Sequence, residues 1–206
     1  MEPTTEKAHY LIREPVWEIA RFFPLQGDWT EQDYLNLPDN TRVELSDGRL
    51  IVLPMPTISH QKIVQFLLHM LERFLVGKYE SALVLVASVP VRLGNGRVRE
   101  PDVLVVLEGE INQKQDEFVE HPDLVVEVLS PSNRSNDLVD KRTEYAEAAI
   151  SEYWIVDPQA KRITVLVLKR GKYIEHGQFD RGQKATSALL KGFEVDTNAV
   201  WQKAGL

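Results

Sequence analysis

The chain has 206 residues, of which 43% are hydrophobic and 27% charged, a composition that fits one soluble globular domain with a sizeable core. It contains no cysteine, which excludes disulfides, thiol chemistry and cysteine-based zinc sites. The formal net charge of −7 argues against a protein that coats nucleic acid by bulk charge. It does not exclude a local site in which a metal ion neutralises clustered carboxylates.

The N-terminus shows no apolar stretch of the signal-peptide type, and the longest apolar run, residues 82–87, is too short to cross a bilayer. We therefore expect a cytoplasmic protein with no membrane partner. Residues 1–27 contain three prolines and Gly27 among scattered aromatic side chains, and are predicted to form an irregular N-terminal arm. Residues 28–206 are predicted to form a single domain.

The first predicted elements are a short helix and a hairpin. Thr30, with Asp33 three residues later, predicts the capped start of a helix that ends before Pro38. The turn residues 46–48 lie between two β-rich runs and predict an N-terminal β-hairpin.

A long helix is predicted next, beginning at Ser59 as the N-cap and ending at Gly77. Ile58 and Ile63 are expected to form a hydrophobic staple around its first turn. The apolar residues that recur at helical spacing are Ile63, Phe66, Leu67, Met70, Leu71, Phe74 and Leu75.

Strands and helices then follow one another to the end of the chain. Residues 101–107 and 122–129 predict strands without polar alternation, which should be central and covered on both faces. The other predicted elements are a strand over 82–93 that Pro90 confines to an edge or a bulge, a turn at 94–96, a helix over 137–149, a strand over 152–156, and a hairpin from 163–168 and 172–178. The predicted fold class is α/β (α+β), with a mixed central sheet flanked by helices and with N-terminal and C-terminal β-hairpins.

One predicted core strand carries a charge. Glu127 lies within the apolar run 124–129, where side chains alternate between two otherwise apolar faces. A buried carboxylate without a partner is costly or becomes protonated, so a cation, a metal ion or several donors should compensate it. Asp102 lies at the start of the other apolar strand, and both carboxylates would meet if the strands are adjacent. A divalent cation between them would make this arrangement tolerable.

A basic side chain is expected to face these carboxylates. Lys141 lies on the helical stripe that Leu138, Tyr145 and Ala149 define, and Arg142 at its edge is the alternative. The side chains predicted to face away are Asp140, Thr143, Glu144 and Glu147. Two acids and a lysine around a divalent metal suit phosphodiester hydrolysis, because the metal polarises the phosphate and the lysine positions water or stabilises charge.

Each of these residues also has an ordinary structural explanation. Asp102 could be a cap or turn residue, and Glu127 an edge residue or a member of a structural ion pair. Lys141 could run along the apolar surface and extend its ammonium into solvent. The three residues together, on consecutive core elements, indicate a metal site more specifically than any one of them alone.

The chain resembles a bacterial family of restriction-endonuclease-like proteins in the PD-(D/E)XK nuclease superfamily. The resemblance is carried by the blocks VELSDGRLIVLP, ISH, REPDVLVV, PDLVVEVLSPS and EYWIVDP, together with the helix that bears Lys141 and Tyr145. It runs from Trp29 to Val167, and the blocks agree in order and spacing. It implies a core of helix, three strands, helix and strand, and it assigns metal binding to Asp102 and Glu127.

The resemblance also implies roles for further residues. In the superfamily a lysine stands two residues after the acid, where this chain has Leu129, and the family suggests that it has moved to Lys141. Glu44 matches an acidic position of the family, which suggests a further ligand of the metal or of water. The alternative is a hairpin residue that faces solvent. His60 matches a family histidine that could contact phosphate or hold Glu44, or it is a plain capping-region residue. His69 is expected to be structural or exposed.

The leading hypothesis is a Mg²⁺-dependent endonuclease that acts on DNA as a homodimer, with Mn²⁺ as a possible substitute. Asp102, Glu127 and the backbone carbonyl of Val128 would hold the metal, and Lys141 would orient the attacking water. The alternative, favoured by the acidic net charge, is a catalytically inactive member of the fold that serves as a binding or assembly module. In a third view, Glu127 and Lys141 are only a buried ion pair.

Overall fold

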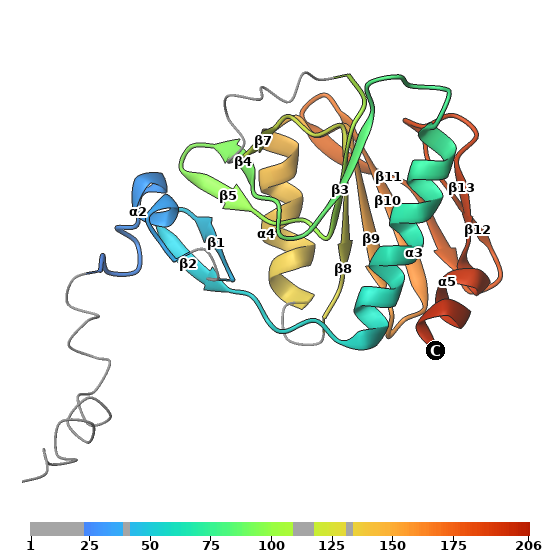
Figure 1. The fold of residues 1–206 in the computed structure, drawn as a ribbon, viewed down its shortest axis with the longest axis horizontal. Coiled ribbons are helices and arrows are strands. Elements are labelled where there is room, and N and C mark those ends of the chain that lie inside the picture. Colours follow the sequence, from blue (N-terminus) through green and yellow to red (C-terminus); the bar gives the residue numbers. More distant parts are fainter. Residues whose placement is uncertain (1–22, 39–41, 109–117, 131–133) are drawn as a thin grey trace, which may run out of the picture.

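The computed structural model describes residues 23–38, 42–108, 118–130 and 134–206, with side chains of the last segment from residue 139 onward. A five-stranded sheet has the strand order β2-β1-β5-β4-β7 (Figure 1). Its strands are β1 (Val43–Ser46), β2 (Arg49–Val52), β4 (Val91–Gly94), β5 (Arg97–Arg99) and β7 (Val119–Glu120).

A six-stranded sheet forms the centre of the fold, in the order β11-β10-β9-β8-β6-β3. Its strands are β3 (Leu83–Val86), β6 (Val103–Val106), β8 (Leu124–Val128), β9 (Glu152–Asp157), β10 (Arg162–Lys169) and β11 (Lys172–Asp180). β8 and β9 are parallel, whereas the other neighbours are antiparallel, so the central sheet is mixed as predicted.

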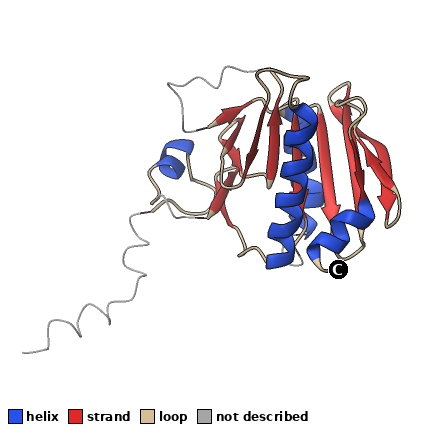
Figure 2. Ribbon diagram, turned by 45° about the vertical axis from the view of Figure 1, so that its right-hand side comes forward, coloured by secondary structure: helices blue, strands red, loops and turns tan. Residues whose placement is uncertain are grey.

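Helices cover both faces of this sheet. The helices are α2 (Glu31–Leu35), α3 (Ile58–Leu75), α4 (Arg134–Glu147) and α5 (Thr197–Ala204). α3 and α5 pack on one face, whereas α4 lies on the other, between the two sheets (Figures 1 and 2). The predicted fold class, with helices on both sides of a mixed sheet, is therefore confirmed.

The two predicted hairpins and the first helix are also confirmed. Thr30 and Asp33 form a capping box at the start of α2, in which each side chain bonds the other residue's backbone N–H. β1 pairs with β2 at the N-terminal end of the fold, and β10 pairs with β11. The C-terminal hairpin is one edge of the central sheet, because β10 also pairs with β9.

The predicted start of α3 is wrong by two residues. Thr57, and not Ser59, is the N-cap, and its side chain accepts a hydrogen bond from the His60 backbone N–H at 3.1 Å. Ile58 is therefore the first helical residue and is 77% exposed, so it does not form the predicted staple with buried Ile63. The helix ends as predicted, with Val76 as the C-cap and Gly77 at a φ of 74°.

The single strand predicted over residues 82–93 is two strands in different sheets. β3 pairs with β6 in the central sheet, whereas β4 pairs with β5 and β7 in the five-stranded sheet. Pro90 lies between them, where no ladder N–H is needed. α4 begins three residues earlier than predicted and ends at Glu147, so Ala149 is an exposed residue beyond the helix.

The strands predicted to be central are fully buried. All residues of β6 and β8 are buried, including Glu127. Val126 and Val128 join the core under α3 and α5, while Val125 and Leu129 join the core beside α4. The alternation predicted for β8 is therefore confirmed, and it turns Glu127 toward α4.

A C-terminal unit that the sequence analysis did not predict covers one side of the central sheet. It comprises β12 (Lys184–Thr186), β13 (Glu194–Asp196) and α5. Fully buried Glu152 on β9 accepts four hydrogen bonds, three of which come from the segment between β12 and β13 and join this unit to the sheet. The donors are Trp154 Nε1 and Ser187 Oγ, both at 2.6 Å, and the backbone N–H groups of Ala188 and Leu189, both at 2.8 Å.

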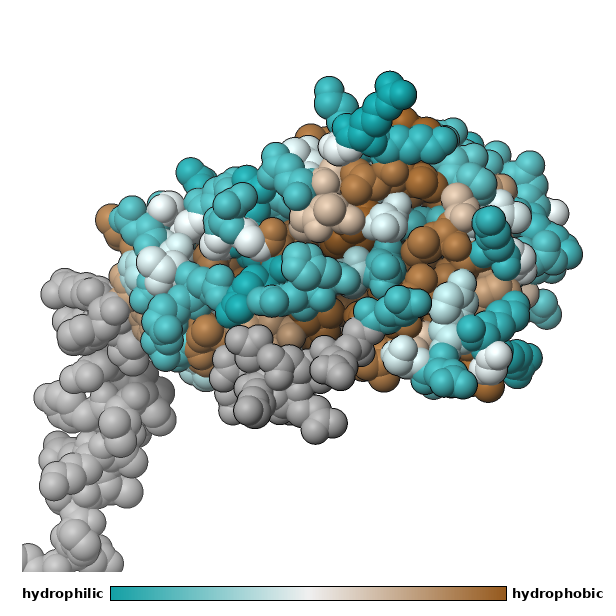
Figure 3. Space-filling model, turned by 90° about the horizontal axis from the view of Figure 1, so that it is seen from above, coloured by the Kyte–Doolittle hydropathy of each residue, from teal (hydrophilic) through white to brown (hydrophobic). Residues whose placement is uncertain are grey.

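The remaining expectations concern the surface and the arm. Seen from above, hydrophilic side chains cover much of the molecule, with hydrophobic patches between them (Figure 3). Within the described ranges, no helix is long and apolar enough to cross a membrane. Most of the predicted arm, residues 1–22, lies outside the described residues.

Candidate active site

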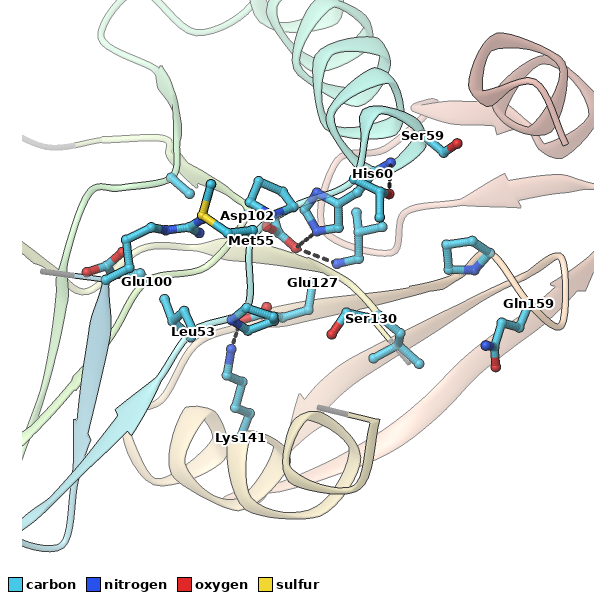
Figure 4. A pocket seen from close by; sticks show the side chains of 18 of the residues that line it. Leu53, Met55, Ser59, His60, Glu100, Asp102, Glu127, Ser130, Lys141 and Gln159 are labelled. Carbon is cyan, nitrogen blue, oxygen red and sulfur yellow. Dashed lines mark hydrogen bonds and ion pairs between the residues drawn. The ribbon is translucent and has the colours of Figure 1, made fainter. Parts of the chain in front are cut away.

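A cavity of about 660 Å³ opens where the N-terminus of α3, the start of β6, the end of β8 and α4 come together (Figure 4). Its polar lining includes His60, Asp102, Glu127 and Lys141, all of which were predicted site residues. Glu44 lies behind Lys141 and does not line the cavity. Apolar residues also line the cavity, among them Leu53, Pro54, Met55 and Pro56.

Strand register brings the two predicted metal ligands together. β6 and β8 are antiparallel neighbours in which Val103 pairs with Val126. Asp102 immediately precedes Val103 and therefore lies opposite Glu127, which places both side chains on the same face of the sheet. Asp102 Oδ2 also accepts a hydrogen bond from the Val128 backbone N–H at 2.7 Å, so the aspartate is fixed to the end of β8.

His60 holds Asp102 and not Glu44, which corrects one of the two functional roles considered for it. Its Nε2 atom lies 3.2 Å from Asp102 Oδ2, and its ring also hydrogen-bonds the backbone of Val128. Burial opposes protonation, but the hydrogen bond and charge of Asp102 outweigh it and raise the pKa of His60. The Nδ1 atom is buried and has no hydrogen-bond partner among the described residues.

Glu127 is compensated by two donors from α4. It is only 4% exposed, and its Oε1 atom accepts hydrogen bonds from Lys141 Nζ at 2.9 Å and from Tyr145 Oη at 2.6 Å. Burial, together with the charges of Glu127 and Glu44, raises the pKa of Tyr145 well above its ordinary value, so the phenol remains a donor. The strand therefore tolerates this carboxylate because a cation and a hydroxyl compensate its charge.

Lys141 bridges two carboxylates. Its Nζ atom lies 2.9 Å from Glu127 and 3.0 Å from Glu44, and it is 4% exposed. Burial opposes ionisation of Glu44, but the charges of Lys141 and Arg99 outweigh it and lower the pKa of that carboxyl. Glu44 is 1% exposed, so the solvent-facing alternative for this residue is wrong.

The predicted faces of α4 need one correction. Glu144 was expected to face away from the sheet, yet it is buried and accepts hydrogen bonds from Arg99 and Ser46. It faces inward because α4 is covered by the five-stranded sheet on the side opposite Glu127. Arg142, the alternative to Lys141, is exposed and donates to the Tyr173 carbonyl at 3.1 Å.

The residues at the cavity fit a divalent cation by their chemistry. Two carboxylates and a backbone carbonyl are the hard oxygen ligands that Mg²⁺ and Mn²⁺ prefer. Among the described residues, both side-chain contacts of Asp102 involve Oδ2, so Oδ1 is the oxygen that can turn toward a cation. The described part of the chain contains no cluster of three or more His, Asp or Glu side chains arranged around one point. A cation here would compete with His60 for Asp102 and Val128.

Several contributors were missed from the sequence. Tyr145 was placed on the sheet-facing stripe and in the family resemblance but was given no role, although its position four residues after Lys141 on one helix face could have indicated a second donor. Arg99 was not singled out at all. His69 is exposed, as expected.

Comparison with known proteins agrees with this architecture. Residues 31–198 match the family model described as "Uma2: Putative restriction endonuclease". The crystal structure of a putative nuclease belonging to DUF820 from Anabaena variabilis ATCC 29413 superposes with a TM-score of 0.73 at 16% sequence identity, covering 88% of this chain and 99% of that chain. This likeness shows that the chain has the restriction-endonuclease-like fold. No curated protein matches the chain.

Proposed function

Since the chain belongs to the Uma2 family of putative restriction endonucleases, we propose that it is a metal-dependent endonuclease that hydrolyses DNA phosphodiester bonds. The observation that carries this proposal is the contact of Lys141 with Glu127 at 2.9 Å, in a cavity that Asp102 also lines. Two acids and a lysine are the groups that such chemistry needs. The resemblance also implies a homodimer, which light scattering of the purified protein would test.

In this proposal Asp102, Glu127 and the Val128 carbonyl would hold Mg²⁺ or Mn²⁺. When bound, the cation would polarise the phosphate and lower the pKa of a bound water. Lys141 would orient the attacking water from its fixed position between two carboxylates. His60 would keep Asp102 turned toward β8.

Asp102→Asn is expected to lower the cleavage rate about 10³-fold, because several kcal/mol of metal-derived stabilisation depend on this charge. Plasmid and single-stranded DNA should be incubated with wild-type and variant protein in the presence of Mg²⁺ or Mn²⁺. Lys141→Ala serves as a second inactive variant. Equal cleavage by all three proteins would identify a contaminating nuclease and remove the support for this proposal.

Arg42 is the proposed contact to a DNA phosphate. It lines the cavity, its Nη1 atom contacts the Met55 sulfur at 3.9 Å, and it forms no ion pair with the described residues. His60 and Lys141, the other basic side chains of the cavity, are each engaged by carboxylates. Among the described basic side chains of the cavity, Arg42 is therefore the one that can bind a DNA phosphate without first leaving a carboxylate.

Arg42→Met is expected to weaken DNA binding at every sequence and to reduce the slope of log affinity against log salt by about one. Fluorescence anisotropy in EDTA measures binding without cleavage. Arg73→Met is the matched control, because Arg73 is exposed in the last turn of α3, far from the cavity end of that helix. An unchanged slope in Arg42→Met would assign the phosphate contact elsewhere.

A binding or assembly module that lacks catalysis is the second candidate. Glu127 already accepts hydrogen bonds from Lys141 and Tyr145, so its charge is compensated by protein groups. This candidate predicts no heat of Mg²⁺ binding by titration calorimetry and no cleavage. The nuclease predicts heat in the wild type that is lost in Asp102→Asn.

A further inference from the structure

Four buried charged residues form a closed ring behind the cavity. Glu44 on β1 contacts Lys141 Nζ at 3.0 Å and Arg99 Nη1 at 2.8 Å. Arg99 on β5 also binds Glu144 through two hydrogen bonds, of 2.6 Å from Nε and 2.8 Å from Nη2. Glu144 lies three residues after Lys141 on α4, so the helix itself closes the ring.

This ring is buried throughout. Arg99 and Glu44 are each 1% exposed, and neither lines the cavity. Burial opposes the charge of Arg99, but its hydrogen bonds to Glu144 and the charges of Glu44 and Glu144 outweigh it and raise its pKa. Replacement of a buried ion pair by packed apolar residues of similar volume is often neutral or stabilising. Stability alone therefore does not account for the ring at this point.

We propose that Arg99 is a positioning residue for Lys141, acting through Glu44. The role in cleavage rests on the proposed function, whereas the positioning of the ammonium does not. Arg99 fixes the Glu44 carboxylate from the side of the five-stranded sheet. Glu44 and Glu127 then both hold the ammonium, each from a different sheet.

The chemistry of the four side chains explains why this arrangement fixes a lysine. A lysine side chain has a flexible stem and a compact charge, so one carboxylate alone leaves its ammonium free to swing. Two carboxylates on rigid strands define its position much better. The planar guanidinium of Arg99 engages Glu144 in two parallel hydrogen bonds, a geometry that lysine cannot reproduce. This pair also sets the rotation of α4 one turn away from Lys141.

The chain contains a matched control for this arrangement. Arg97 lies two residues before Arg99 on the same strand and pairs with Glu147, three residues after Glu144 on the same helix. Arg97 also binds Asp47 at 2.7 Å. It joins the same two elements as Arg99, but among the described residues its ion pairs are with Asp47 and Glu147, and not with Glu44. Loss of Arg97 therefore tests the effect of weakening the contact between β5 and α4 alone.

The experiment compares Arg99→Met with Arg97→Met by NMR and by kinetics. An ammonium held by carboxylates exchanges its protons slowly enough to give a ¹H–¹⁵N signal in cold solution, and Lys141→Arg assigns that signal by its loss. We expect Arg99→Met to lose the Lys141 signal and to lower kcat about 10²-fold, as for loss of one preorganised group, with KM within threefold. Arg97→Met should keep both the signal and kcat. A retained signal and kcat in Arg99→Met would overturn the proposal.

Glu44→Gln provides a second variant in case Arg99→Met does not fold. It removes one carboxylate charge while the amide oxygen can still accept from Arg99, and it should also lose the Lys141 signal. Arg99→Lys should restore the signal only in part, because lysine cannot form the paired hydrogen bonds to Glu144. If the wild type cleaves no DNA, the proposed function fails, yet the NMR comparison still decides whether Arg99 positions Lys141.

Discussion

Lys141→Met is expected to lower kcat about 10²–10³-fold and the free energy of unfolding by about 3–5 kcal/mol. The substitution removes the charge that lies between Glu127 and Glu44 and leaves two buried carboxylates short of a partner. Urea denaturation followed by tryptophan fluorescence measures the stability, and plasmid cleavage measures the rate. Lys62→Met on the exposed face of α3 is the control and should change neither quantity.

The double variant Lys141→Met/Glu127→Gln separates the nuclease from a purely structural ion pair. It removes both charges together, keeps an acceptor for Tyr145, and leaves Glu44 paired with Arg99. Stability should return to near the wild-type value, because no unpaired charge remains at this point. A nuclease stays inactive in this background. Recovery of cleavage together with stability would show that Lys141 and Glu127 have only a structural role.

Glu152→Ala is expected to lower the free energy of unfolding by about 3–5 kcal/mol, since it leaves four donors, two of them buried, without their acceptor. These donors come from β9 and from the turn that leads to β13, so their loss detaches the C-terminal unit from the central sheet. The same urea experiment measures this effect, and hydrogen exchange should show α5 losing protection first.

Glu194→Ala is the control for this prediction. Glu194 belongs to the same C-terminal unit but is exposed, where it pairs with Lys184. No measurable change in stability is expected, because exposed ion pairs contribute little. Cleavage per folded molecule should also be unchanged in Glu152→Ala, since Glu152 does not line the cavity. Similar losses of stability in the two variants would show that the four hydrogen bonds contribute no more to the free energy of unfolding than an exposed ion pair does.

The parts of the site that were predictable from sequence depend on local periodicity. Alternation along β8 placed Glu127 on one face, and helical spacing placed Lys141 on the inward side of α4. Asp102 and Glu127 meet because β6 and β8 are neighbours. The apolar runs predicted that both strands are central, whereas their adjacency was assumed. Each inference needed only a few consecutive residues and one assumption about which elements are adjacent.

The parts that were not predictable depend on contacts between distant segments. Arg99 lies 55 residues from Glu44 and 45 residues from Glu144, on a strand of three residues that has no periodicity to read. Glu144 was assigned to the solvent side because nothing indicated that a second sheet covers α4. The C-terminal helix did carry local signals, Asp196 as its N-cap and Gly205 at its end, that were not used.

The connection between the two sheets has a mechanical consequence. Arg99 ends β5 in one sheet, and only Glu100 and Pro101 separate it from Asp102, which precedes β6 in the other. Three peptide links reach at most about 11 Å, so this short segment limits how far Arg99 and Asp102 can move apart. Any swing of one sheet against the other must pull on Asp102 directly. The position of the Asp102 carboxylate therefore depends on the spacing of the two sheets. A ligand that increased this spacing would move Asp102 in the cavity, even if the ligand bound elsewhere.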